Sequence, residues 1–160
     1  MDIWAWVHEK EEQLYDAGEY RLANIITSMP RHCCDDEHDI VDALYAEGLP
    51  LAQKAKEPWA EVFIRHWYLQ SQVLTRNNAK GMLSEAIELL ELSHSEEAKG
   101  CPQRICAVQD LANCYGKADG PGFADERIAV STETLAEIDP SWPCYTCIGA
   151  EYIDALVDDQ

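Results

Sequence analysis

Cysteine is the residue type whose spacing in this chain most readily suggests chemistry. Cys144 and Cys147 form a Cys-x-x-Cys pair directly after Trp142-Pro143, and Cys101 and Cys106 lie in a similar position earlier in the chain. Four converging thiolates would suit a zinc ion, and a Cys-x-x-Cys pair is also a motif of thiol–disulfide exchange. The alternative is that these cysteines are small apolar residues packed between helices, because cysteine is among the most buried residue types.

Two physical arguments weigh against chemistry at these thiols. Neighbouring helix axes lie about 8–10 Å apart, which is wide for thiolates that must reach one zinc ion over bonds of about 2.3 Å. A βαβ pattern, which surrounds the Cys-x-x-Cys motif of redox proteins, is not recognisable around Cys144. The histidines and cysteines at His32, Cys33, Cys34 and His38 lie among carboxylates, but their spacing fits no closed zinc pattern. We therefore expect no bound metal or cofactor, although a cysteine-based metal or redox protein remains an alternative.

Catalytic motifs are not recognisable in the sequence. The chain contains no Gly-x-Ser-x-Gly, no phosphate-binding glycine loop and no His-Glu-x-x-His. His66 and His94 lie on apolar helix faces, where a buried histidine is a more common interpretation than a catalytic base. We therefore expect that the protein is not an enzyme.

Charge and composition narrow the class of partner. The chain of 160 residues has 30 acidic and 12 basic residues, a formal net charge of −18, and 47% apolar residues. This composition suits a single packed domain spanning 1–160, and its charge repels nucleic acid and anionic membranes while favouring a basic protein partner. No run of eighteen apolar residues occurs, and the first twenty positions include several charged residues, so we expect neither a membrane span nor a signal peptide. We therefore expect a cytoplasmic protein whose thiols are reduced.

The elements that must position these residues are helices arranged as a repeat. Pro58, Pro102 and Pro143 are separated by 44 and 41 residues, and each precedes a helix-compatible run. A fixed period of this size is typical of stacked helical hairpins. We expect an all-α superhelix of about eight antiparallel helices without strands, with hairpins near 2–29, 35–56, 58–99 and 102–140 and a capping helix at 144–157.

Proline and glycine predict where the helices break. We expect the second helix to stop at Met29-Pro30, because proline disfavours α geometry in the preceding residue. Pro50 predicts a kink or break in the third helix. The glycines and Pro121 in 116–123 predict an irregular connection.

Three segments resemble the tetratricopeptide repeat family. Gly18-x-Tyr20-x-x-Ala23 is similar to that family's inter-helix pattern, Leu111-Ala112-x-x-Tyr115 to its first-helix pattern, and Leu135-x-x-Ile138-Asp139-Pro140 to its closing segment. The spacing here exceeds the usual period of about 34 residues in that family. The resemblance implies a right-handed stack of helix pairs whose first helices line a concave face that binds proteins. It implies no catalytic residues.

If the first helices line such a face, the seventh and eighth positions after each repeat proline point alike in successive units. With residues one helical turn away, these positions give a predicted protein-binding row: Glu61, Arg65, His66, Tyr68, Gln109, Asp110, Asn113 and Glu151. A solvated helix face with no partner is the alternative interpretation of the same pattern. Candidate aromatic anchors are Trp4, Trp59, Trp67 and Tyr68.

The functional hypothesis is an acidic protein of the inhibitor or immunity type that neutralises a basic protein partner. A general tetratricopeptide-like scaffold that binds peptides has the same features, and a chain that forms part of a longer array or larger assembly is a further alternative.

Overall fold

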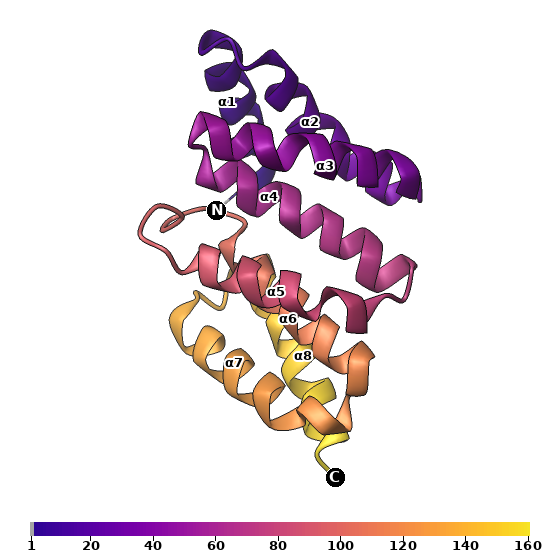
Figure 1. The fold of residues 1–160 in the computed structure, drawn as a ribbon. Helices are drawn as coiled ribbons and strands as arrows, with labels where there is room; N and C mark the ends of the chain where they lie inside the picture. The colour runs from indigo at the N-terminus through magenta and orange to yellow at the C-terminus, as the bar shows by residue number, and fades with distance from the viewer. Residues whose placement is uncertain (1) are drawn as a thin grey trace.

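The computed structural model describes residues 2–160, and over these residues the fold is all-helical with eight α-helices (Figure 1). This confirms the expected all-α class and the expected number of helices, whereas the tetratricopeptide-like superhelix stays a prediction. A π-helical turn, Gln70–Thr75, extends α4, and a short 3₁₀ turn, Pro121–Phe123, precedes α7. The helices are α1 (Ile3–Asp16), α2 (Tyr20–Cys34), α3 (His38–Ala55), α4 (Pro58–Leu69), α5 (Ala79–Ser93), α6 (Arg104–Asp119), α7 (Ala124–Glu137) and α8 (Pro143–Asp158).

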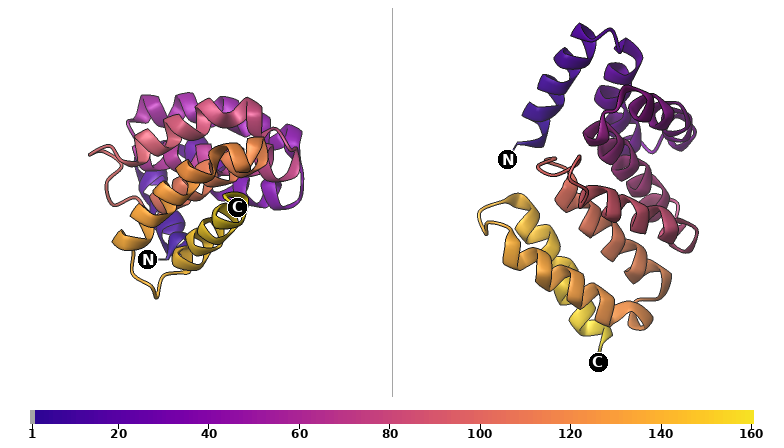
Figure 2. Two further views of the ribbon diagram at one scale, coloured as in Figure 1. Left: turned by 90° about the horizontal axis from the view of Figure 1, so that it is seen from below. Right: turned by 60° about the vertical axis from the view of Figure 1, so that its left-hand side comes forward.

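The even-numbered helices form a continuous row through the molecule. Helices α2, α4, α6 and α8 each contact the next member of the row, whereas α3, α5 and α7 pack against their even-numbered neighbours (Figures 1 and 2). We call these two sets the even row and the odd row, the latter including α1. The most extensive pairings are α1–α2, α3–α4, α5–α6 and α7–α8, while α4 also packs against α5 and α6 against α7, the helices of the expected hairpins 58–99 and 102–140. Helix α8 consequently has a full partner in α7.

Local sequence signals explain several helix starts. Pro58 and Pro143 occupy the first positions of α4 and α8, where the missing proline N–H is not needed for helical hydrogen bonds. Asp2 caps α1, because its carboxylate accepts hydrogen bonds from the backbone N–H groups of Trp4 at 2.9 Å and Ala5 at 3.2 Å. The repeat prolines therefore mark consecutive members of the even row.

The expected end of the second helix at Met29-Pro30 is wrong, because α2 continues through Pro30 to Cys34. Helix α3 continues through Pro50 without a break and ends at Ala55, close to the expected boundary at 56. A proline inside a helix removes one hydrogen bond, but Met29, Pro30 and Cys33 are buried on the apolar side of α2, and tertiary packing offsets the local cost.

The segment 116–123 is more regular than expected. Helix α6 continues to Asp119 and is followed directly by the 3₁₀ turn. Gly116 faces the guanidinium group of Arg127, and a Cβ atom there would lie 3.1 Å from Arg127 Cζ. The glycine therefore permits close packing of α6 against α7 instead of ending the helix.

Three apolar clusters make up the core. The first joins α1–α4 around Trp6, Leu22, Ile25 and Phe63, and the second joins α4–α6 with several alanines and Cys114. The third is small and joins α6, α8 and the end of α7 through Ile105, Val108, Ile138 and Ile148. None of the helices described in residues 2–160 is both long and apolar enough to cross a lipid bilayer.

Candidate functional site

The residues of the predicted protein-binding row divide between two sides of the even row. Arg65 and His66 are adjacent on α4, but Arg65 contacts a residue of α5, whereas His66 contacts one of α6. A pair of consecutive helical positions is separated by about 100° around the axis, so both cannot lie on one face. The eight residues therefore do not form one continuous surface.

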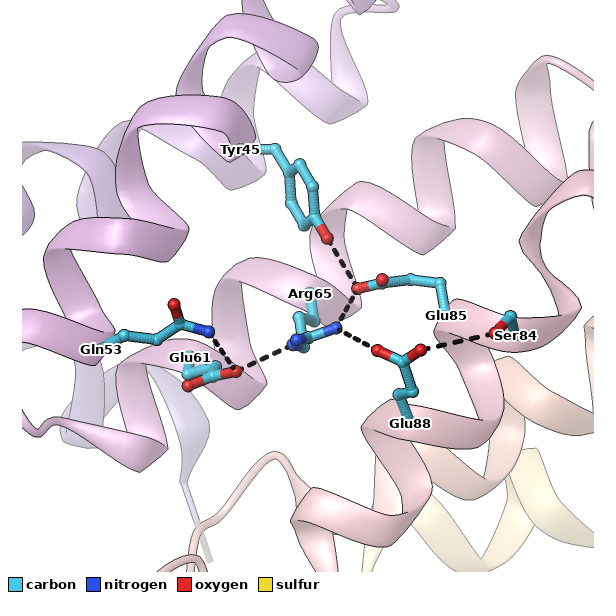
Figure 3. A network of polar contacts seen from close by, with 7 residues as sticks. All are labelled: Tyr45, Gln53, Glu61, Arg65, Ser84, Glu85 and Glu88. Atoms are coloured by element: carbon cyan, nitrogen blue, oxygen red, sulfur yellow. Dashed lines mark hydrogen bonds and ion pairs between the residues drawn. The ribbon is translucent and has the colours of Figure 1, made fainter.

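Glu61 and Arg65 belong to a polar network between α3, α4 and α5 (Figure 3). Arg65 Nε donates to Glu61 at 3.1 Å and its Nη1 to Glu85 at 2.5 Å, while Glu88 lies 3.7 Å away. The Arg65 side chain is only 11% exposed. One guanidinium thus neutralises part of the charge of three carboxylates and connects two helices.

Tyr45 of α3 completes this network. Its hydroxyl donates to Glu85 at 2.8 Å, and its ring stacks on Tyr68 with centroids 3.8 Å apart. Burial raises the pKa of Tyr45, and the hydrogen bond to Glu85 raises it further. Because these groups satisfy one another, this cluster fixes helix packing and leaves Arg65 engaged inside the protein.

His66 and Asp110 form a buried pair between α4 and α6. His66 Nδ1 lies 2.7 Å from Asp110 Oδ2, and the side-chain amide of Gln70 donates to Asp110 Oδ1 at 2.6 Å. The Asp110 side chain is fully buried. Both residues occupy the eighth position after a repeat proline, so the repeat predicted their common direction, but they bind each other instead of facing solvent.

The corresponding position of α8 is Glu151, which lies in a polar cavity of about 360 Å³ between α6, α7 and α8. Asn113 lines the same cavity. Burial raises the pKa of Glu151, and Arg127 acts in the opposite direction. Gln109 is half-buried on α6, where its backbone carbonyl accepts from the Asn113 amide at 3.0 Å.

Arg127 is the residue of this cavity that sequence analysis missed. It is 3% exposed, is paired with Asp158, and leaves its Nε without a hydrogen-bond partner within the described residues. The missed signal is Gly116, whose missing side chain makes room for the guanidinium group.

The cysteines fall into separate environments. Cys33 is buried, and its thiol donates to the Trp67 carbonyl at 3.6 Å, whereas Cys34 is exposed. His32 pairs with Glu37, and His38 hydrogen-bonds to Ser71 at 3.0 Å, so these two histidines are engaged separately. Within residues 2–160, no group of three or more His, Cys, Asp or Glu side chains is arranged to hold a metal ion.

Cys106 and Cys144 lie in the first turns of α6 and α8, two helices that pack against each other. The influence of the Cys106 thiol lowers the pKa of Cys144 to about 6, and the same interaction together with burial raises the pKa of Cys106. Cys147 lies one turn further along α8 and is exposed, with its pKa raised by partial burial and by Cys144.

A second cavity, of about 500 Å³, lies where the start of α1 faces the starts of α6 and α8. We call it the thiol cavity because Cys101 and Cys144 both line it. Its walls are mainly apolar, and Lys99, Arg104 and Glu137 add charge. Sequence analysis placed Cys101 and Cys144 in one neighbourhood but did not predict a cavity. The cavity also depends on the position of α1, whose residue Ile3 lines it. The remaining lining residues are Ile3, Gly100, Pro102, Ile105, Trp142 and Pro143.

The exposed carboxylates are unevenly distributed between the two rows. Within the helices, eleven exposed Asp and Glu residues belong to the odd row and two to the even row. Those of the odd row are Glu9, Glu12, Asp16, Asp39, Glu47, Glu88, Glu91, Asp125, Glu126, Glu133 and Glu137, and those of the even row are Asp119 and Asp154. Among the helical residues, the exposed carboxylates therefore belong mainly to the odd row.

Comparison of the chain with protein-family models, with curated proteins and with solved structures gave no match. The resemblance to tetratricopeptide repeats therefore stays a prediction that depends on the quoted residues.

Proposed function

We propose that the protein is a non-catalytic helical repeat protein that binds and neutralises a basic protein partner through the carboxylates of its odd row. The observation that carries this proposal is the uneven distribution of exposed carboxylates, eleven on the odd row against two on the even row. A surface of one sign accelerates the encounter with a partner of the opposite sign and selects against acidic proteins.

The pairing of the basic residues supports this proposal. Lys10, Arg65 and Arg127 have side chains that are at most 13% exposed, and each is paired with a carboxylate. Basic side chains that are engaged in this way neutralise little of the outer surface. Helix α7 alone carries four exposed carboxylates, none of which is paired with a basic side chain within residues 2–160.

Trp4 is the predicted aromatic anchor that fits this proposal best. It is 53% exposed, and its ring lies 6.2 Å from that of Trp67. Trp59, Trp67 and Tyr68 are half-buried and packed against other rings, so they contribute more to the fold than to an outer surface. An exposed tryptophan on an otherwise acidic helix row is a suitable contact at the centre of an interface.

Affinity capture from a cell lysate at low salt, followed by elution with a salt gradient, tests this proposal. The bait is compared with two variants that remove three charges each. Glu12→Gln/Glu91→Gln/Glu133→Gln neutralises exposed residues of α1, α5 and α7, and Asp119→Asn/Asp154→Asn/Asp159→Asn is the matched control outside the odd row. The captured protein is then purified, and its affinity for all three is measured as a function of salt.

We expect capture of a basic protein whose affinity falls at least tenfold in the odd-row variant at low salt and stays near the parent value in the control. Equal weakening by both variants would show that only total charge matters. Capture of no protein, or of an acidic one, would contradict the proposal. Weak binding of many short peptides by the even row, without salt dependence, would favour the tetratricopeptide-like scaffold instead.

A further inference from the structure

The polar cavity between α6, α7 and α8 contains an arginine whose hydrogen-bonding capacity is mostly unused. The Arg127 side chain is only 4% exposed, and within residues 2–160 its guanidinium group makes one hydrogen bond, from Nη1 to Asp158. Its Nε is buried and has no partner among the same residues. A buried donor without an acceptor costs free energy, so a ligand that supplies an acceptor at this position is stabilised there.

The edge of this guanidinium group formed by Nε and Nη2 suits a carboxylate. The two nitrogens donate side by side, in the fork geometry that binds both oxygens of a carboxylate. A Cβ atom at Gly116 would lie 3.1 Å from Arg127 Cζ, 3.2 Å from Nη2 and 3.4 Å from Nε. Because Cζ is the nearest of these atoms, the backbone of α6 lies over the flat face of the group and not against this edge. Lys117, the next residue of α6, is exposed and adds a second cation to the cavity.

The wall that α8 contributes to the cavity is acidic. Glu151, Asp154 and Asp158 recur at helical spacing, so they lie on one face of α8, and all three line the cavity. Asp158 is engaged by Arg127, whereas Glu151 and Asp154 form no ion pair within residues 2–160. Burial raises the pKa of Glu151, although Arg127 acts in the opposite direction. A further cation beside Glu151 would therefore favour its ionised form.

These two kinds of group indicate a ligand that carries charges of both signs. A simple anion would meet three carboxylates, and a simple cation would leave the Arg127 edge empty. The volume of about 360 Å³ lies at the lower end of the range of small-molecule sites. We propose that this cavity binds a free α-amino acid with a cationic side chain, whose carboxylate pairs with Arg127 and whose ammonium groups pair with Glu151 and Asp154. The cationic side chain is preferred because carboxylates outnumber basic groups in the cavity by three to two.

Isothermal titration calorimetry of the intact protein with L-lysine and three analogues tests this proposal. Cadaverine is lysine without the carboxylate, 6-aminohexanoate is lysine without the α-ammonium group, and L-glutamate carries an acidic side chain. We expect saturable binding of L-lysine and an affinity at least tenfold lower for each analogue, because each lacks a charged contact or adds a repulsive one. If net charge alone mattered, cadaverine would bind this acidic protein more tightly than lysine does.

Two variants with matched controls locate the binding site. Arg127→Lys keeps the charge but loses the forked edge, so its affinity for L-lysine is expected to fall to that of cadaverine. Glu151→Gln removes one carboxylate and is expected to weaken the binding of L-lysine at least tenfold. The exposed controls Arg31→Lys and Glu133→Gln should leave this affinity within about twofold of the parent value. Circular dichroism of each variant confirms that the comparison is made on folded protein.

The wild-type titrations can overturn the proposal without any variant. Absence of saturable L-lysine binding up to about 10 mM would do so, as would equal or tighter binding of cadaverine. Preference for L-glutamate or 6-aminohexanoate over L-lysine would exclude the ammonium contacts of Glu151 and Asp154. An unchanged affinity in Arg127→Lys would place the ligand elsewhere. Amide hydrogen exchange is the second readout, since a ligand bound between these helices should slow exchange in α7 and α8.

Discussion

The two halves of the molecule are built from different kinds of core. Of the twelve largest fully buried side chains, ten lie between Leu14 and Leu69, and only Leu89 and Ile148 lie in the second half. The second half is filled instead by small residues, with five alanines and two cysteines among the buried members of its main cluster. Small buried side chains let helices approach closely but remove less apolar area from water.

The second half also contains more buried polar groups without partners. Gln103 Oε1, Arg127 Nε and Ser131 Oγ are buried and without a hydrogen-bond partner within the described residues, whereas the first half has two indole N–H groups in this state. Each such group opposes folding. We infer that α1–α4 form the stable part of the fold and that α7 and α8 open first.

Truncation of the central ring of the first core is expected to have the largest effect. Phe63 is fully buried and packs against Trp6 and Trp67, with ring centroids 5.5 and 6.1 Å apart. Phe63→Ala is expected to lower the free energy of unfolding by about 3–5 kcal/mol, because it removes apolar contacts and leaves a cavity. Urea denaturation monitored by far-UV circular dichroism measures this loss.

Ile148→Ala is the matched truncation in the third cluster. It is expected to open α8 locally and to lower global stability by less than Phe63→Ala, with faster amide hydrogen exchange confined to α7 and α8. Equal global losses in the two variants, with uniform exchange, would show that the halves unfold as one unit and would contradict the comparison.

The buried pair between α4 and α6 connects the halves, and its removal is expected to have the next largest effect. Asp110→Ala leaves the His66 ring and the Gln70 amide without an acceptor, at a cost of about 2–4 kcal/mol. Asp110→Asn keeps the shape and one acceptor, and a smaller loss of about 1–2 kcal/mol is expected. A second transition in the denaturation curve of Asp110→Ala would indicate that the halves have separated. Full stability of Asp110→Ala would exclude this pair as the connection.

The sequence predicted the helices more completely than the contacts between them. The repeat prolines and the apolar periodicity predicted eight helices and the common direction of His66 and Asp110. Sequence alone did not show that these two residues bind each other, since that depends on the distance between α4 and α6. The expected break at Pro30 failed for a similar reason, because burial of Met29 and Cys33 outweighs one missing hydrogen bond.

The candidate site shows the same limit. Cys144 and Cys147 attract attention because they are close in sequence, but the residue with the largest effect on the pKa of Cys144 is Cys106, 38 residues away. Arg65 was expected on a binding surface because it is polar, but its partner Glu85 comes from α5 and also accepts a hydrogen bond from Tyr45 of α3. The direction of a side chain follows from periodicity, whereas its partner follows from tertiary packing.

Removal of Arg65 is expected to lower stability by a smaller amount. Arg65 lies on the side of α4 that faces α5, opposite the pair of His66 and Asp110. Arg65→Met keeps much of the side-chain volume but leaves Glu61, Glu85 and Glu88 facing one another, and a loss of about 2 kcal/mol is expected. Added salt should recover part of this loss by screening the carboxylates. Arg21→Met, in the exposed pair with Glu47, is the control and should change stability only marginally. A salt-independent loss in Arg65→Met would point to packing instead of charge.

The smallest expected effect is an alkaline loss of stability from the buried thiol of Cys114. Burial raises its pKa from 9.0 to about 12, with a further contribution from Asp110. Because the folded-state pKa is the higher one, the contribution to stability is complete below pH 9 and is lost as the pH rises toward 12. At pH 9.5 ionisation of the thiol already favours the unfolded chain by about 1 kcal/mol.

Cys114→Ala removes this ionisation, so only the wild type loses stability through it between pH 7 and 9.5. The difference between the free energies of unfolding of the wild type and the variant should therefore shrink by that amount. Cys33, whose pKa burial raises to about 11, is the counterpart in the first half, and Cys33→Ala should flatten the pH dependence in the same direction. If α5–α8 open before the rest of the chain, Cys114 ionises through local opening, and its contribution to global unfolding falls below that of Cys33. Equal slopes for the two variants would instead place both thiols in one cooperative unit.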